Sequence, residues 1–328
     1  MAMPYGRSKR VSQKKTEREE SAVIYTVTLN PSVDFIRRIE NMHIGEINYS
    51  TDDRMSAGGR AIMVSRMLHR LSIPTTATGF VGGHTGSYIE EELDREGILH
   101  DFIRTQSNTR LNLSLFVDDV ETRILGRGGE IRSEEINDLL YYLSRIREGD
   151  YLVVAGSLPP GMSTDIYERM FEIATVNGAT FLPIISPEPL KQALVKKPLL
   201  IAPTMNDLRA LFSVEEISAK EAVDYAKQLL SEGAQNVLIN RERMGSLFVT
   251  GDGEVYQAEG PEGPIVSATY TNMALIAGFI GNYMRTNDAK KAFPSAQGCA
   301  NATYGVETLP SLAMIRHAIT AVQVTRLA

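Results

Sequence analysis

Short apolar runs along the chain are separated by longer stretches whose apolar residues recur every three or four positions. The runs "AVIYTVTL" (22–29), "YLVVAGS" (151–157), "LLIAPT" (199–204) and "NVLIN" (236–240) are typical of buried β-strands. Between them, "AIMVSRMLHRLS" (61–72), "TGSYIEEELDREG" (85–97) and "STDIYERMFEIATVNG" (163–178) have the period of amphipathic helices. This alternation predicts an α/β fold with a mostly parallel sheet covered by helices.

Two segments do not fit the alternation. Residues 36–57 and 108–125 alternate apolar and polar positions without a long helix, which predicts strands of a small sheet exposed on one face. Residues 246–258 read as a hairpin across Gly251-Asp252-Gly253. In the last third we expect helices at about 274–285, 289–304 and 309–325, with residues 267–273 forming the turn before the first of them.

Composition narrows the class of protein. The chain has 328 residues, 43% of them hydrophobic, a net charge of −6 and one cysteine, Cys299. These values favour one large α/β domain or two smaller ones and argue against nucleic-acid binding and a disulfide framework. No metal-ligand spacing, membrane-length apolar run or secretory segment is evident, so we expect a cytoplasmic protein without a structural metal, a nucleic-acid partner or a membrane anchor.

Residues 1–22 differ from the rest of the chain. "GRSKRVSQKKTEREES" clusters arginine and lysine, then glutamate, with almost no apolar residue. This composition predicts a disordered basic tail before a domain spanning 23–328. A basic arm that docks on an acidic protein partner is the alternative, and the acidic "TEREE" argues against a transit peptide.

We looked for binding residues just after the predicted strands, because ligands of open α/β sheets bind beyond the carboxyl ends of the strands. Asp34 follows the first strand, and the glycine pair of "SAGGRA" (56–61) precedes a helix whose N-terminus favours an anion. "NTRLN" (108–112) places Arg110 and Asn112 on one face of a strand, where an arginine suits bidentate phosphate binding. Taken singly, each feature also fits a plain turn or a solvated surface residue.

In their order along the chain, these motifs resemble the ribokinase-like (pfkB) carbohydrate kinases, and most closely the branch of 1-phosphofructokinase and tagatose-6-phosphate kinase. The residues that carry the resemblance cover about 23–325: "YTVTLNPSVDF", "SAGGRAIMVSRMLHRL", "GFVGGHTGSYIEEELDREGI", "NTRLNL", "VVAGSLPPGM" and "IAGF". The resemblance implies one ribokinase-like α/β domain and a β-sheet lid, drawn here from about 36–57 and 108–125, which often forms a dimer interface.

The resemblance also implies a sugar-binding side that is mostly retained. The family's sugar-binding aspartate corresponds to Asp34, its glycine pair to Gly58 and Gly59, and its phosphate-binding arginine to Arg110, with Asn112 beside it. Arg60 replaces the lysine that usually follows the glycines. Met63 replaces a sugar-contacting asparagine and cannot make its hydrogen bonds.

The nucleotide-binding side implied by the resemblance is altered at four segments. Counting back from Ala277-Gly278-Phe279, the Gly-Ala-Gly-Asp that forms the family's anion hole and general base becomes Tyr270, Thr271, Asn272 and Met273. A thioether takes no proton at neutral pH, and loss of a general base typically costs about 10²–10⁴ in rate. The other altered positions are Thr204 and Asp207 in "APTMNDL", Ile184 in "PIISP", and "NRERMG" from Asn240 to Gly245 in place of a glycine-rich run.

Three functional hypotheses follow. The first is a pfkB-family homologue that has lost phosphotransfer and serves as a sugar-phosphate sensor or structural subunit, for which no cofactor is expected. The alternative is an active ATP- and Mg²⁺-dependent 1-phosphofructokinase or tagatose-6-phosphate kinase, in which Asp207 is the nearest spare acid for a replacement base. The third is an interaction module of a larger assembly that binds neither ligand. For partners we expect a phosphorylated hexose and a second copy of the chain bound through the lid.

Overall fold

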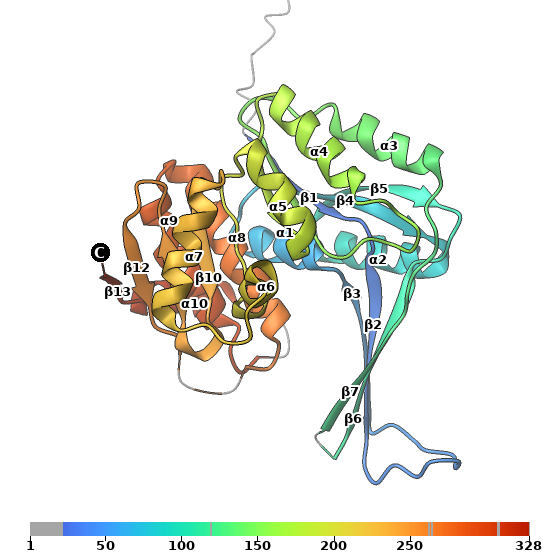
Figure 1. The fold of residues 1–328 in the computed structure, drawn as a ribbon. Coiled ribbons are helices and arrows are strands. Elements are labelled where there is room, and N and C mark those ends of the chain that lie inside the picture. The colour runs from blue at the N-terminus through green and yellow to red at the C-terminus, as the bar shows by residue number, and fades with distance from the viewer. Residues whose placement is uncertain (1–21, 119, 262, 264, 307–308, 328) are drawn as a thin grey trace, which may run out of the picture.

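The computed structural model describes residues 22–118, 120–261, 263, 265–306 and 309–327. The predicted basic tail, apart from its last residue, therefore lies outside the described residues. Figure 1 shows the overall arrangement: a body of helices and strands, and a long β-ribbon that projects from it.

The body is built on a five-stranded parallel sheet, as the alternation of strands and helices predicts. Its order is β5-β4-β1-β8-β9, with bounds β1 Ile24–Thr28, β4 Thr75–Gly82, β5 Leu99–Thr105, β8 Tyr151–Ala155 and β9 Thr180–Ile184. Successive residues of β8 face opposite layers, since Leu152 and Val154 pack in one hydrophobic core and Val153 and Ala155 in the other. The sheet thus has apolar residues on both faces, as a sheet covered by helices on both sides requires.

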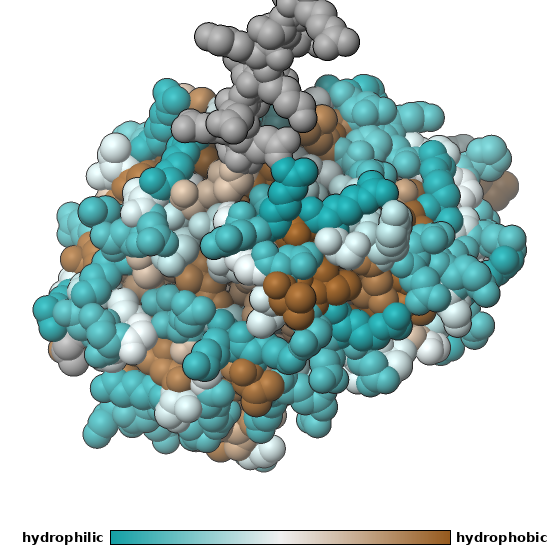
Figure 2. Space-filling model, turned by 90° about the horizontal axis from the view of Figure 1, so that it is seen from above, coloured by the Kyte–Doolittle hydropathy of each residue, from teal (hydrophilic) through white to brown (hydrophobic). Residues whose placement is uncertain are grey.

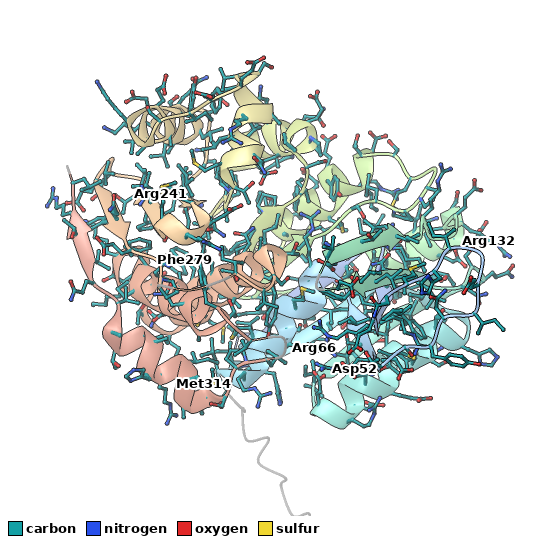
Figure 3. The ribbon with its side chains drawn as sticks, turned by 90° about the horizontal axis from the view of Figure 1, so that it is seen from below. Asp52, Arg66, Arg132, Arg241, Phe279 and Met314 are labelled. Carbon is teal, nitrogen blue, oxygen red and sulfur yellow. The ribbon has the colours of Figure 1, made fainter. Side chains whose placement is uncertain are left out.

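Helices cover the two faces of the body. One core includes residues of α3 (Ser133–Leu143), α4 (Asp165–Val176), α5 (Pro187–Ala193), α6 (Met205–Phe212) and α7 (Ala219–Ser231). The other includes residues of α1 (Arg60–Arg70), α8 (Ala268–Thr286), α9 (Ala289–Ala302) and α10 (Leu312–Ala321), with Phe279 near the middle of this layer in Figure 3. Seen from above, the surface is mainly hydrophilic with scattered apolar patches (Figure 2), as expected of helices that turn their apolar stripes inward.

The predicted strand at 199–204 is replaced by two isolated bridges, Ile201 to Val237 and Thr204 to Asn240. Pro203 has no N–H to donate, which accounts for the broken ladder. Beyond the bridges lies a second, antiparallel sheet of β10 (Val237–Asn240), β11 (Ser246–Val249), β12 (Val255–Ala258) and β13 (Val324–Arg326). The predicted hairpin across Gly251-Asp252-Gly253 is the β11–β12 pair.

The projecting ribbon is the predicted lid sheet. Its order is β3-β2-β6-β7, with bounds β2 Ser32–Ile39, β3 Asp52–Gly58, β6 Arg110–Val117 and β7 Val120–Leu125. Strand β2 pairs antiparallel with β3 and parallel with β6, while β7 returns antiparallel to β6. The fold is therefore the predicted one: a helix-covered parallel sheet with a small lid sheet at its edge.

Two expectations for the last third were wrong. The first helix there starts at Ala268 rather than near 274, because Ser267 caps it by accepting a hydrogen bond from the backbone N–H of Tyr270 at 3.3 Å. The final helix ends at Ala321, and the residues after it form β13 at the edge of the second sheet. Among the described residues, no helix is both long and apolar enough to span a bilayer.

Cys299 lies in α9 with its side chain fully buried. Burial without a compensating charge raises the pKa of its thiol to about 12. We therefore expect no measurable reaction of the native protein with a thiol reagent such as Ellman's reagent at pH 8, and stoichiometric reaction in guanidinium chloride. Rapid labelling of the native protein would show that α9 opens readily.

Candidate sugar-phosphate site

The base of the lid holds the predicted sugar-binding carboxylate. Asp34 lies on β2, directly opposite Ser56 of β3 and Asn112 of β6. Its Oδ1 accepts hydrogen bonds from the hydroxyl of Ser32 and from Nδ2 of Asn112, each at 2.7 Å. The carboxylate is thereby oriented by two neutral donors, as a group that binds sugar hydroxyls needs to be.

The glycine pair lies against this carboxylate. A methyl group added to Gly58 would lie 2.6 Å from Cγ of Asp34 and 2.7 Å from Oγ of Ser32. Gly59 has φ 132°, a conformation that favours glycine, and it precedes the first residue of α1. The structure thus places Gly58 against Asp34, with Gly59 next to it at the start of α1, and their binding of a sugar stays a prediction.

Two arginines share this neighbourhood. Arg110 donates from Nε to the carbonyl of Asn30 at 3.2 Å and from Nη1 to the carbonyl of Gly126 at 3.0 Å. Burial lowers the pKa of Arg110, the nearby Asp34 opposes this effect, and the charge of Arg60 adds to it. Burial also lowers the pKa of Arg60, and the charge of Asp207 opposes this effect. Arg110 thus lies within electrostatic reach of Asp34 and Arg60, and a guanidinium group suits the binding of a phosphate.

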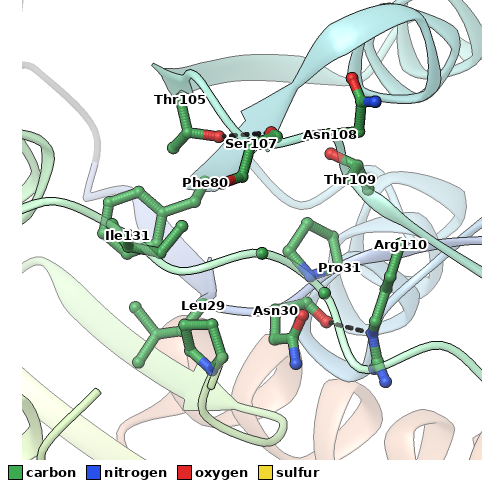
Figure 4. A pocket seen from close by; sticks show the side chains of 13 residues that line it. Leu29, Asn30, Pro31, Phe80, Thr105, Ser107, Asn108, Thr109, Arg110 and Ile131 are labelled. Carbon is green, nitrogen blue, oxygen red and sulfur yellow. Dashed lines mark hydrogen bonds between the residues drawn. The ribbon is translucent and has the colours of Figure 1, made fainter. Parts of the chain in front are cut away.

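A small pocket extends from Arg110 into the body (Figure 4). It offers about 20 Å³, enough for an ordered water molecule but not for a hexose. Its lining comes from the ends of β1 and β5 and from the loops around 105–110 and 128–131. It includes Asn30, whose amide donates to the carbonyls of Arg127 and Leu158 at 3.3 and 3.2 Å.

The residues at the predicted nucleotide positions are engaged with one another. Thr204 caps α6, where its backbone N–H and its hydroxyl donate to Oδ2 of Asp207 at 2.9 and 2.7 Å. The backbone N–H of Asp207 donates in return to the hydroxyl of Thr204 at 3.1 Å. This is a reciprocal capping box, so Asp207 has a structural role at the start of α6.

The run from Asn240 to Gly245 forms a compact turn containing the 3₁₀ helix η2 (Glu242–Met244). Asn240 accepts from the backbone of Glu242 at 2.8 Å and donates to Oδ1 of Asn272 at 3.3 Å. Arg241, labelled in Figure 3, is buried and donates to the carbonyl of Met244 at 2.9 Å, and burial lowers its pKa. Gly245 has φ 76° and packs on the backbone near Glu259, 2.6 Å from where its Cβ would lie.

The head of α8 carries the substituted anion-hole and base positions. Tyr270, Thr271, Asn272 and Met273 all lie inside the helix. Thr271 shares a hydrogen bond of 2.9 Å with Thr303, Asn272 is buried, and Met273 is 1% exposed within the core under α1 and α8. The Tyr270 ring is largely buried, which raises the pKa of its hydroxyl. Tyr270, Thr271, Asn272 and Met273 are therefore helical packing residues in this structure.

Sequence reasoning missed two residues that organise the sugar side, Asn30 and Ser32. Both stand in "TVTLNPSVD", and Ser32 precedes Asp34 by the two-residue period that places them on one face of a strand. Among the described residues, no group of three or more histidine, cysteine, aspartate or glutamate side chains is arranged to hold a metal ion.

Comparisons with known proteins identify the family of the chain. The model of the pfkB family carbohydrate kinases matches residues 26–308. The 1-phosphofructokinase of Bacillus subtilis is 35% identical to this chain over 305 residues, which cover 93% of this chain and 100% of the relative. The D-tagatose-1-phosphate kinase of Bacillus licheniformis is 30% identical over 307 residues, with the same coverage of both chains. The structure of phosphofructokinase-2 from Escherichia coli in complex with fructose-6-phosphate has the same fold, with a TM-score of 0.82 at 23% identity over 91% of this chain and 98% of that one. The chain belongs to the pfkB family of carbohydrate kinases, with the ribokinase-like fold, and is homologous to the 1-phosphofructokinases and tagatose-phosphate kinases of that family.

Proposed function

We propose that this chain binds a phosphorylated ketohexose at the base of its lid and has lost the transfer of phosphate to it. The sugar would contact Asp34 and the glycine pair, and its phosphate would be held by Arg110 and Arg60. The hydrogen bonds that orient Asp34, and the electrostatic influence of that carboxylate on Arg110, support the binding half of the proposal.

Met273 is the main support for a loss of phosphotransfer, because it occupies the position at which the family resemblance implies the general base. Its side chain is 1% exposed and packs in an apolar core. Asp207, the acid considered above as a replacement base, accepts two hydrogen bonds from Thr204 through its Oδ2. Asp34 is held by Ser32 and Asn112. Met273 cannot act as a base, one oxygen of Asp207 is engaged at the start of α6, and Asp34 has the sugar-binding role in this proposal.

The residues present also do not fit ATP–Mg²⁺. A magnesium ion prefers carboxylate and other oxygen ligands, and here Oδ2 of Asp207 already accepts two hydrogen bonds from Thr204 while Oδ1 of Asn240 accepts one from Glu242. The turn of η2 places Arg241 and its neighbours where the family resemblance implies open, glycine-rich backbone. We therefore derive no catalytic step through a nucleotide.

An active ATP-dependent sugar-phosphate kinase is the second candidate. The curated relatives that cover nearly the whole chain favour it, since they are named as 1-phosphofructokinase and D-tagatose-1-phosphate kinase. No comparison indicates that activity has been lost. The two candidates share the sugar-binding face and differ in whether the chain binds ATP–Mg²⁺ and turns it over.

Thermal unfolding with ligands separates the candidates. Fructose 1-phosphate or tagatose 6-phosphate at 100 times its Kd should stabilise the protein by about 2.7 kcal/mol. We expect a rise in Tm with one of these sugar phosphates and none with ATP–Mg²⁺ alone. ADP release in a coupled assay with sugar phosphate and ATP–Mg²⁺ would instead establish the kinase. A protein that responds to no ligand would favour a structural subunit that binds neither.

We also propose that two copies of the chain associate through their lids. The lid carries exposed apolar side chains, among them Met55, Leu111, Ile124 and Leu125. Oligomers occur among structural homologues, for phosphofructokinase-2 of Escherichia coli has a tetrameric, inhibited form. A protein partner for residues 1–22 stays a prediction from their charge.

A further inference from the structure

An ion-pair cluster around a buried arginine lies where the lid joins the body. Arg66 of α1, labelled in Figure 3, is 8% exposed. Its Nε and Nη2 donate to the two carboxylate oxygens of Glu96 at 2.9 and 2.8 Å, and Nη2 also donates to Oε1 of Glu92 at 2.7 Å. Both glutamates lie on α2 (Gly83–Glu96), four residues apart and so on one face of the helix.

This cluster binds both backbone groups of one lid residue, Ala57, at the open edge of β3. Ala57 donates its backbone N–H to Oε2 of Glu92 at 2.6 Å, and its carbonyl accepts from Nη1 of Arg66 at 2.6 Å. Strand β3 is an edge strand of the lid sheet, so the outward-facing groups of Ala57 have no neighbouring strand to pair with. One turn before Glu92 on the same face, the hydroxyl of Tyr88 donates to the carbonyl of Met55 at 3.0 Å. Helix α2 thus closes the edge of β3 at its base.

The residue after Ala57 is Gly58, whose backbone packs against Asp34. A shift of Ala57 therefore moves the glycine pair relative to the carboxylate. Sites that orient a ligand need their groups held to within about 0.5 Å, and supporting contacts usually supply that precision. We propose that Arg66 and Glu92 are positioning residues of the sugar site, which act through Ala57 to hold Gly58 against Asp34 and so to place Gly59 after it.

The chain offers a matched pair of variants. Glu92→Gln and Glu96→Gln each remove one negative charge from the same arginine on the same helix face, but only Glu92 touches Ala57. Hydrogen–deuterium exchange of a peptide covering 57–60 measures how firmly the backbone of these residues is held, without any ligand. Calorimetric titration with fructose 1-phosphate measures the affinity of the sugar site, and this second measurement rests on the proposed function.

We expect Glu92→Gln to accelerate exchange at 57–60 and to raise the Kd for fructose 1-phosphate about tenfold, since small misplacements of binding groups have large effects. Glu96→Gln should accelerate exchange at 57–60 much less and alter the Kd by less than about twofold, because Glu96 has no bond of its own to β3 and Arg66 keeps its bond to Glu92. Should Glu92→Gln not fold, Arg66→Lys serves instead, since lysine keeps the charge but lacks the planar fork.

The possible results are distinguishable. Equal effects of the two glutamate variants, or faster exchange at 57–60 without a change in affinity, would overturn the positioning role. If the unmodified protein binds no sugar phosphate, the proposed function fails. The exchange contrast then decides alone whether the cluster holds the glycine pair.

Discussion

Gly58→Ala should weaken the binding of fructose 1-phosphate about 10²-fold. The backbone of Gly58 is in a conformation that any residue can adopt, so the effect of the added methyl group is purely steric. That methyl group would lie 2.6 Å from Cγ of Asp34, and Asn112 and Ser32 hold the carboxylate in place. The carboxylate must therefore leave its donors or β3 must move away.

The same substitution should lower the free energy of unfolding by about 1–3 kcal/mol, as overpacking typically does. Urea unfolding of Gly58→Ala, Asp34→Ala and the double variant measures the coupling between the two positions. In the double variant we expect the methyl group to cost at least about 1 kcal/mol less than in the single variant, because the carboxylate is gone. Additive effects would mean that Gly58 and Asp34 do not press on each other in solution.

The pattern of the sequence was sufficient to predict the sheet, its helical cover and the lid. Strand β8 shows why: its residues are apolar on both faces, which only a sheet between two helical layers satisfies. The shared face of Arg110 and Asn112 was predictable for a similar reason, because the period of two places both on one side of β6. Asp34 was expected only to follow the first strand, outside the predicted lid segment 36–57, whereas the structure places it on β2 opposite Asn112.

The start of α8 was harder to predict from the sequence, because the first residue of a helix depends on a single capping residue. Ser267 caps the helix, so α8 includes residues 268–273. These residues contain no glycine and no charged side chain that would mark a helix start. The capping box of Thr204 and Asp207 was visible as a threonine followed three residues later by an acid, but it was interpreted only as an altered nucleotide motif. The contacts of Arg66 with α2 and β3 join residues up to 30 positions apart, and no local pattern predicts such contacts.

The packing of Met273 bears directly on whether the chain can transfer phosphate. In this structure a carboxylate at position 273 would be enclosed by apolar side chains of α1, α8 and α9. Met273→Asp should therefore destabilise the protein by about 3 kcal/mol or more at pH 8, the range of an unpaired buried charge. Met273→Leu conserves the volume and should cost less than about 1.5 kcal/mol.

The pH dependence of stability tests whether a buried charge causes the loss of stability in Met273→Asp. Burial raises the pKa of a carboxyl group above its unfolded value of about 3.9, so the unfolded state of Met273→Asp binds fewer protons than the folded state above that pH. Its stability relative to the unmodified protein should then fall as pH rises from 4 towards the raised folded pKa. Met273→Asn, which cannot ionise, should show the same difference from the unmodified protein at every pH. If instead the aspartate and asparagine variants are equally stable throughout, position 273 is reached by water, and the main structural support for lost phosphotransfer is gone. A pH-dependent loss of stability in Met273→Asp would mean that this single substitution cannot restore a general base. The aspartate would then either be protonated in the folded protein or unfold α8.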